Sequence, residues 1–231
     1  IIDNLRYGYK ILKNNSISSY KIDSEILMSQ TLEISREELI LNLEKKVNLK
    51  EKEKYYNFIN RRKKNEPIAY IINNKSFWRD KFLIDKNVLI PRPDSEHLVE
   101  QTLKLIKKKQ TKKILDIGVG SGCLTISILK ERPYCKCDAI DVSKKALKLA
   151  KMNANLHQLT DRIKFYKSDV DNFCNDKYDL IISNPPYINK HEIKYLGVIN
   201  FEPKIALDGG LDGLEVIKKV ISKSKYLLKI N

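Results

Sequence analysis

The stretch Lys113-Ile114-Leu115-Asp116-Ile117-Gly118-Val119-Gly120-Ser121-Gly122 runs from an apolar segment into a glycine-rich turn. The apolar part predicts a short buried strand, and the apolar-rich residues 123–129 that follow predict a helix. Glycines at such a junction let the backbone approach a ligand closely and let the helix begin against the strand. The pattern predicts a ligand crevice at the end of the strand, although many nucleotide-binding folds share it.

Two more predicted strands end in acidic residues. Residues 136–140 lead into Asp141, which lies about 20 residues past the glycine turn, a spacing at which a carboxylate can accept both hydroxyls of a ribose. Residues 162–166 form a third candidate strand, which ends near Asp169. Because the carboxyl ends of parallel strands meet at one edge of a sheet, these side chains and the glycine turn are expected to line one crevice.

A fourth apolar run, residues 178–182, stops at Ser183-Asn184-Pro185-Pro186-Tyr187. The two prolines cannot continue ladder bonding, and each holds φ at about −65°, so Asn184 is left at the carboxyl end of a strand. The Asn184 side-chain oxygen and the Pro185 carbonyl are two acceptors that can converge on one planar NH₂ group, while the Tyr187 ring offers a stacking surface. The alternative interpretation is a proline turn with a capping asparagine.

Together, residues 116–122, Asp141, Asp169 and residues 184–187 resemble a class I S-adenosylmethionine-dependent methyltransferase that methylates amino groups. More narrowly, Ile90-Pro91-Arg92-Pro93-Asp94-Ser95-Glu96 and the segment 201–213 (FEPKIALDGGLDG) resemble the HemK/PrmC family, the N5-glutamine methyltransferases of peptide chain release factors. The resemblance covers nearly the whole chain. It departs from the family pattern at residues 94–95, where Glu-Thr is more common, at Asn65, where Gly is more common, and at Val170, where some relatives have tryptophan.

This resemblance implies a reaction and a set of site residues. A methyl group would pass from S-adenosylmethionine, leaving S-adenosylhomocysteine, to the side-chain amide nitrogen of the glutamine in the Gly-Gly-Gln sequence of release factors. The residues expected to act in catalysis and to bind the substrate are Asn184, Pro185, Pro186 and Tyr187. The residues expected to bind the cofactor are Asp116, Gly118, Val119, Gly120, Ser121, Gly122, Asp141, Asp169, Val170 and Asn184. No metal is expected.

Within this set, the predicted roles differ. Asn184 and the Pro185 carbonyl would orient and polarise the nitrogen, Pro186 would fix the turn, and Tyr187 would pack on the amide plane. Asp141 would hold the ribose.

The chain is expected to have an α/β fold with three parts. Apolar residues recur at three- and four-residue spacing in 5–12, 24–32, 36–43 and 49–62, which predicts a small helical domain over residues 1–72. The resemblance implies that this domain holds the protein substrate; a bundle that only covers the catalytic domain is the alternative. Residues 73–92 are expected to form a β-hairpin linker and residues 93–231 a Rossmann-like methyltransferase domain.

Several helix boundaries can be predicted from capping residues. Asp23-Ser24 and Ser35 are expected to cap two helices of the first domain, and Asp94-Ser95 a helix ending at about residue 105. A last helix is expected over residues 214–228. Only about four parallel strands are found, in the expected order 3-2-1-4, which leaves the strand before Asn184 as an apolar edge. Since the family closes its sheet with further strands, we expect the C-terminal strands to be missing from this sequence.

Composition limits the alternatives. The 231 residues, 42% of them hydrophobic, suit one or two compact domains, and no apolar run of 18 or more residues predicts a membrane span. The net charge of +15 is spread along the chain rather than gathered in one patch, so no stable nucleic-acid binding is expected. The four cysteines lack metal-ligand spacing and are expected to be buried, reduced thiols of a cytoplasmic protein, which we expect to be monomeric.

Three alternative functions remain open at this point. A ribosomal-protein glutamine could be the acceptor in place of the release factor. A DNA or RNA base amino-methyltransferase could use the same proline turn, but it needs base flipping and a target-recognition module, and no obvious module is found. A catalytically silent RNA-binding protein could retain the fold, although the intact glycine turn and the intact residues 184–187 argue against it.

Overall fold

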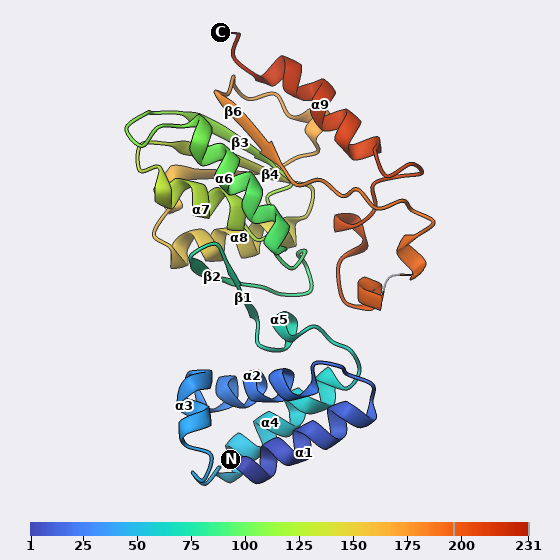
Figure 1. The fold of residues 1–231 in the computed structure, drawn as a ribbon. Helices are drawn as coiled ribbons and strands as arrows, with labels where there is room; N and C mark the ends of the chain where they lie inside the picture. The colour runs from blue at the N-terminus through green and yellow to red at the C-terminus, as the bar shows by residue number, and fades with distance from the viewer. Residues whose placement is uncertain (196, 231) are drawn as a thin grey trace. The chain divides into compact units, whose positions relative to one another are not determined.

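A computed structural model describes residues 1–195 and 197–230 of the chain. Contacts within it divide the chain into two units, Ile1–Asn73 and Asn74–Asn231 (Figure 1).

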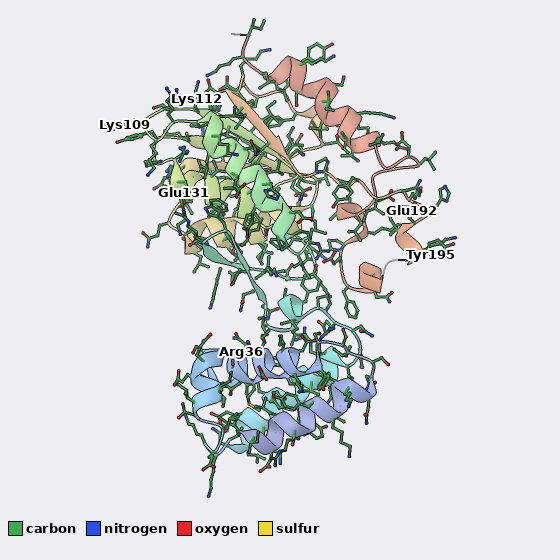
Figure 2. All side chains as sticks on the ribbon, in the orientation of Figure 1. Arg36, Lys109, Lys112, Glu131, Glu192 and Tyr195 are labelled. Carbon is green, nitrogen blue, oxygen red and sulfur yellow. The ribbon has the colours of Figure 1, made fainter. Side chains whose placement is uncertain are left out.

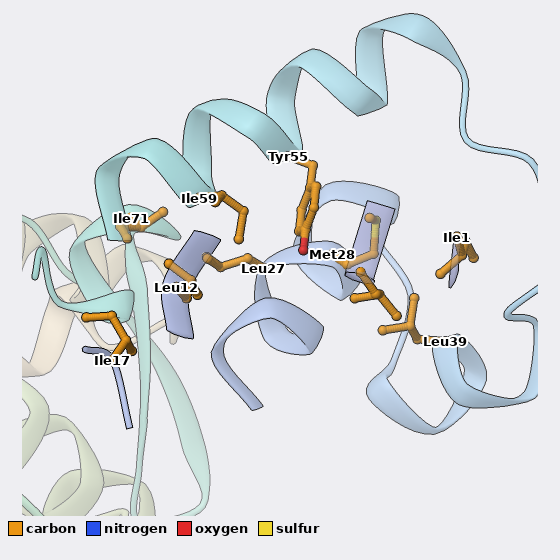
Figure 3. Close-up of a cluster of buried hydrophobic side chains, with 10 residues drawn as sticks. Ile1, Leu12, Ile17, Leu27, Met28, Leu39, Tyr55, Ile59 and Ile71 are labelled. Atoms are coloured by element: carbon orange, nitrogen blue, oxygen red, sulfur yellow. The ribbon is translucent and has the colours of Figure 1, made fainter. Parts of the chain in front are cut away.

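The first unit is helical, as the sequence predicts. Its helices are α1 (Ile2–Asn14), α2 (Tyr20–Leu32), α3 (Arg36–Leu41), α4 (Leu49–Arg62) and the short α5 (Ile68–Ile71). Their apolar stripes meet in one core, where Leu12, Leu27 and Tyr55 are among the fully buried side chains (Figure 3). Burial of these side chains, rather than helix propensity alone, holds short helices such as α3 and α5 in place.

Helix caps in the first unit confirm one expectation and correct another. Ser35 is the N-cap of α3 and its hydroxyl accepts a hydrogen bond from the Glu38 backbone N–H at 3.1 Å. The prediction that Asp23-Ser24 caps a helix is wrong, because α2 already begins at Tyr20. The buried Asp23 carboxylate instead forms an ion pair with Arg62 at 2.7 Å, a partner 39 residues away that local sequence does not reveal.

The second unit begins with an antiparallel hairpin of β1 (Asn74–Phe77) and β2 (Asp80–Leu83). Trp78 lies in the turn with φ of 57°. The Trp78 indole Nε1 and the Arg79 guanidinium both contact Glu131, at 3.3 Å and 3.0 Å. Glu131, labelled in Figure 2, is the last residue of α7 (Cys123–Glu131). These contacts join the hairpin to the rest of the second unit.

A parallel sheet of four strands forms the centre of the second unit, which confirms the expected α/β fold. The strands are β3 (Lys113–Ile117), β4 (Lys136–Asp141), β5 (Ile163–Lys167) and β6 (Leu180–Ser183), in the order β5-β4-β3-β6. The remaining helices are α6 (Glu96–Leu105), α8 (Lys144–Leu156) and α9 (Glu215–Leu227). Short 3₁₀ turns occur at Pro93–Ser95, Thr160–Arg162, Val170–Asn172, Ile193–Tyr195, Gly197–Asn200 and Lys204–Ala206.

Helices cover both faces of this sheet (Figure 1). Along β3, Asp116 faces α7, since its carboxylate accepts a hydrogen bond from Thr125. Side chains alternate along a strand, so Leu115 and Ile117 face the opposite side, where they share a buried cluster with Val220 and Leu227 of α9. Because both faces are covered, consecutive residues of β3 and β4 are buried, on either side of the sheet, rather than alternating between buried and exposed.

The strand β6 lies at the edge of the sheet, as the predicted order requires. Just before it, Tyr178 donates its backbone N–H to Leu227 at 2.8 Å and accepts one from Lys229 at 3.0 Å. An isolated parallel bridge between Tyr178 and Leu228 results. The start of this edge is therefore paired with the segment that follows α9.

Two further expectations concern cysteines and membranes. Cys123, Cys135 and Cys137 are buried as predicted, whereas Cys174 is exposed, contrary to the prediction. Over the described part of the chain, every helix is too short or too polar to cross a bilayer.

Candidate active site

A cavity of about 510 Å³ opens at the carboxyl ends of the parallel strands in the second unit. Its size is that of a small-molecule site. It brings together most of the residues that the sequence predicted for the site: Gly118, Val119, Gly120, Ser121, Asp141, Asp169, Val170, Asn184, Pro185 and Pro186. Asp116, Gly122 and Tyr187 are not among the residues that line it.

The glycine turn after β3 is held open by backbone contacts. The N–H groups of Gly118 and Val119 donate to the Ile140 carbonyl at 2.9 and 3.0 Å. Gly118, Gly120 and Gly122 have φ of 77°, 54° and 83°, a backbone conformation that residues other than glycine adopt only with strain. A Cβ at Gly118 would meet none of the described atoms within 4 Å, so this position faces open space.

Gly122 serves packing instead. A Cβ there would lie 3.2 Å from Ile126 Cδ1 and 3.5 Å from Ala150 Cβ. Gly122 therefore allows α7 to begin in close contact with Ala150 of α8 and is not part of the cavity wall.

Asp141 at the end of β4 faces the cavity with both oxygens partly engaged. One oxygen accepts the Gly120 N–H at 3.0 Å and the other accepts the Ser143 N–H at 2.8 Å. Burial raises the pKa of Asp141, and these backbone N–H groups oppose that rise. Since a carboxylate has about four acceptor positions, about two remain for hydroxyl groups of a ligand.

Asp169 and Val170 form the wall beyond β5. Asp169 accepts the Asp171 N–H at 3.0 Å and so caps the 3₁₀ turn Val170–Asn172. Val170 is buried and belongs to the apolar cluster under the cavity. This wall offers an apolar surface beside a carboxylate.

Asp116 lies within the protein rather than on the cavity wall. It is 1% exposed, and its Oδ2 accepts a 2.6 Å hydrogen bond from the Thr125 hydroxyl. No described atom pairs with its Oδ1. Burial raises the pKa of Asp116 to about 7, so near neutral pH the protonated form is a substantial part of the population. Its position between β3 and α7 suits an effect on the shape of the glycine turn rather than contact with a ligand.

The turn after β6 places the Asn184 carboxamide on the cavity wall. Asn184 Nδ2 donates to the Ser95 hydroxyl at 3.0 Å, and both residues line the cavity. Pro185 and Pro186 line the same wall, whereas Tyr187 lies outside the lining and is 64% exposed. An exposed aromatic ring beside this turn is available to contact a partner.

A glycine-rich loop supports this turn from behind. Ile188 donates its N–H to Leu207 at 3.1 Å and accepts one from Gly209 at 2.9 Å. Gly213 has φ of 73°, and a Cβ there would lie 2.6 Å from the Tyr187 carbonyl oxygen. The glycines of the 201–213 segment therefore allow two backbones to approach closely.

Sequence reasoning missed one ion pair at the site. Arg92 and Glu202 form a 2.6 Å ion pair between the two segments that carry the narrower family resemblance. The Glu202 side chain is 0% exposed and that of Arg92 is 38% exposed. Burial raises the pKa of Glu202, and the Arg92 guanidinium opposes that rise. The opposite charges of Arg92 and Glu202 in the two motifs are the sequence feature that could have indicated this pair. With 110 residues between them, the sequence does not show that they are in contact.

Comparison with known proteins decides the family. A family model described as the PrmC N-terminal domain matches residues 3–72, and one described as the methyltransferase small domain matches residues 95–201. A release factor glutamine methyltransferase of Clostridium acetobutylicum is 38% identical over 234 residues, covering 99% of this chain and 82% of that protein. The chain belongs to the release factor glutamine methyltransferase family. It is accordingly an enzyme of the methyltransferase class.

Other known proteins are also similar to the chain, with different coverage. The release factor glutamine methyltransferase of Clostridium botulinum is 39% identical, with 98% of this chain and 82% of that protein covered. A bifunctional methyltransferase of Rickettsia bellii is 36% identical, and the match spans 98% of this chain but only 46% of that protein. Among solved structures, the hMettl16 catalytic domain in complex with a MAT2A 3'UTR hairpin has a TM-score of 0.53 at 23% identity, with 63% of this chain and 56% of that chain covered. At that identity the match concerns the fold alone.

Proposed function

We propose that this enzyme transfers a methyl group from S-adenosylmethionine to the side-chain amide nitrogen of a glutamine in a peptide chain release factor. The observation that carries the proposal is the position of the Asn184 carboxamide. It lies on the wall of a cavity whose other walls are the glycine turn 118–121 and Asp141. A side chain suited to bind an amide, Asn184, and residues suited to bind a nucleoside therefore line the same cavity.

The residues present fit S-adenosylmethionine. Gly118 leaves open space beside the loop, Asp141 has acceptor positions for ribose hydroxyls, and Val170 offers an apolar contact for an adenine ring. When bound, this cofactor supplies a methyl group on a sulfonium sulfur, which leaves as a neutral thioether. We propose that Ser121 and the backbone of residues 118–120 hold its methionine and ribose end.

The residues of the proline turn would prepare the nitrogen. A glutamine amide nitrogen is planar, its lone pair is delocalised, and its protons are too weakly acidic for removal by a side chain beforehand. The Asn184 Oδ1 and the Pro185 carbonyl oxygen would accept hydrogen bonds from its two N–H groups, which would position the nitrogen and polarise it. Pro186 would fix the turn, and the exposed Tyr187 ring would pack on the amide plane. The nitrogen would release a proton to water after it gains the methyl carbon.

The remaining parts of the chain receive proposed roles. We assign residues 1–72 to holding the protein substrate, 73–92 to a hairpin linker and 93–231 to the methyltransferase domain. The enzyme would work as a cytoplasmic monomer without stable nucleic-acid binding. Light scattering after gel filtration tests the monomer, and a filter-binding titration with RNA at low and moderate salt tests the last point.

The deciding experiment offers labelled S-adenosylmethionine and a purified release factor to the enzyme. We expect label in the release factor, and none when the glutamine of its Gly-Gly-Gln sequence is replaced by another residue. Parallel reactions contain ribosomal proteins or RNA in place of the release factor. The assignment would be overturned if the release factor were labelled equally after the glutamine is replaced, or if label appeared only in a ribosomal protein or RNA.

A further inference from the structure

The Ser95 hydroxyl has a different partner from the one that local sequence predicts. Ser95 occupies the N-cap position of α6, yet its side chain makes no capping hydrogen bond. Its hydroxyl instead accepts from Asn184 Nδ2 at 3.0 Å, across 89 residues of sequence. The expectation that Ser95 caps the helix through its side chain is therefore wrong, and the hydroxyl is used at the cavity.

The segment that carries Ser95 is stiff. Pro91 and Pro93 restrict its backbone, and the Ser95 N–H donates to the Arg92 carbonyl at 3.0 Å. Arg92 is in turn held by Glu202 at 2.6 Å. A hydroxyl on such a segment offers a hydrogen-bond partner at a fixed position to a side chain on a different element.

The acceptor matters because a carboxamide has two unlike ends. The terminal torsion of asparagine is roughly two-fold, so a half-turn exchanges the NH₂ donor with the oxygen acceptor. With Nδ2 bonded to Ser95, Oδ1 has no hydrogen-bond donor among the residues that the structure describes and can accept one. After a half-turn, the NH₂ would face an incoming NH₂ group, and two donors cannot bond each other. Donation from Nδ2 also polarises the carboxamide and strengthens Oδ1 as an acceptor.

We propose that Ser95 is a positioning residue that holds the Asn184 carboxamide with its oxygen available to the substrate nitrogen. This inference rests on the proposed function for its consequence in catalysis, while the hydrogen bond itself can be tested without any reaction. Without the hydroxyl, Nδ2 loses its partner, and the carboxamide is held less firmly in the orientation seen here.

The test compares Ser95→Ala with Ser95→Thr, which keeps the hydroxyl at a position bordering the cavity. Ser222→Ala, on the exposed face of α9, controls for the substitution itself. In single-turnover methyl transfer to the release factor, Ser95→Ala should be slower by about tenfold, the loss expected for one such hydrogen bond. Ser95→Thr and Ser222→Ala should remain within about twofold of the unmodified enzyme, and cofactor affinity measured by calorimetry should stay unchanged in all three.

Two further readouts separate positioning from a merely structural role. In an Asn184→Ala background, Ser95→Ala should cause no additional loss of rate. In ¹⁵N NMR spectra, the Asn184 side-chain NH₂ is assigned by its disappearance in Asn184→Ala. Its hydrogen exchange should be faster in Ser95→Ala and unchanged in Ser95→Thr.

Several results would overturn the inference: equal loss in Ser95→Ala and Ser95→Thr, a parallel fall in cofactor affinity, or additive losses with Asn184→Ala. If the unmodified enzyme methylates no glutamine, the proposed function fails. The hydrogen-exchange measurement still decides whether Ser95 holds the carboxamide. An exchange rate of the Asn184 NH₂ that is the same in Ser95→Ala as in the unmodified protein rejects the inference by itself.

Discussion

Replacing Arg92 by alanine should destabilise the second unit strongly and in a pH-dependent way. Removing one partner of a fully buried ion pair costs about 3–5 kcal/mol, because the other charge is left buried and unpaired. The Glu202 side chain is 0% exposed, but that of Arg92 is 38% exposed, so solvent already screens part of the attraction. We therefore expect a loss of about 2–3 kcal/mol in the free energy of unfolding at pH 8. In a chain of this length, the melting temperature would fall by about 4–12 °C.

The pH dependence follows from the direction of the Glu202 shift. Burial raises the pKa of Glu202, and the Arg92 guanidinium lowers it, so Arg92→Ala raises it further. When the pKa of a carboxyl group is higher in the folded than in the unfolded state, its contribution to stability is fully present below the unfolded-state pKa. That contribution is lost as the pH rises through the folded-state pKa. The loss caused by Arg92→Ala should thus be smaller at pH 5 than at pH 8.

Urea unfolding followed by tryptophan fluorescence measures this loss, because Trp78 is the sole tryptophan and lies in the second unit. Glu202→Gln added to Arg92→Ala should recover part of the lost stability at pH 8, since a neutral amide replaces the unpaired charge. The control Lys218→Ala breaks an ion pair with Asp212 whose side chains are 65% and 47% exposed, and should cost under about 1 kcal/mol. Equal losses at pH 5 and pH 8, or no recovery in the double variant, would refute the reasoning.

Two other predictions concern Asp116 and Gly213. Burial raises the pKa of Asp116 to about 7, so protonation of this side chain contributes fully to stability below about pH 4, and that contribution is lost as the pH rises to about 7. Asp116→Asn should therefore become more stable relative to the unmodified protein between pH 5 and pH 7, by up to about 1.4 kcal/mol per pH unit in urea unfolding. A difference in stability that does not depend on pH would contradict this. Gly213→Ala would place a Cβ 2.6 Å from the Tyr187 carbonyl at φ of 73° and should cost about 1–3 kcal/mol in the same assay together with a slower methyl transfer. Gly197→Ala is its matched control, since a Cβ there would meet no described atom within 4 Å, and equal effects of the two substitutions would reject the steric argument.

Much of the fold could be predicted because its signals are local. Each parallel strand is a short apolar run with a breaker or an acid at its end, and the amphipathic spacing of the first unit is visible within single helices. The helix α8 was not predicted, although Ser143 caps it by accepting the Ala146 N–H. The four-residue helix α5 is too short to show a period.

The features that sequence reasoning missed depend on distant partners. Asp23 is a residue type that often caps helices, yet it lies inside α2, where its carboxylate pairs with Arg62. Ser95 also resembles a cap, and Asn184 is its partner instead. Asp116 belongs to the glycine-turn motif, but strand alternation directs it towards Thr125 and away from the cavity. A motif predicts which residues matter near a site, whereas the direction of each side chain requires the packed fold.

The central claim is that Asn184 prepares the accepting nitrogen while other residues hold the cofactor. Its most direct test measures two quantities on Asn184→Ala: the single-turnover rate of methyl transfer to the release factor glutamine, and the dissociation constant of S-adenosylmethionine by calorimetry. We predict a rate lower by on the order of a hundredfold or more, with a dissociation constant within about twofold of the unmodified enzyme. A preserved rate, or a cofactor affinity that falls in parallel with the rate, would contradict the account.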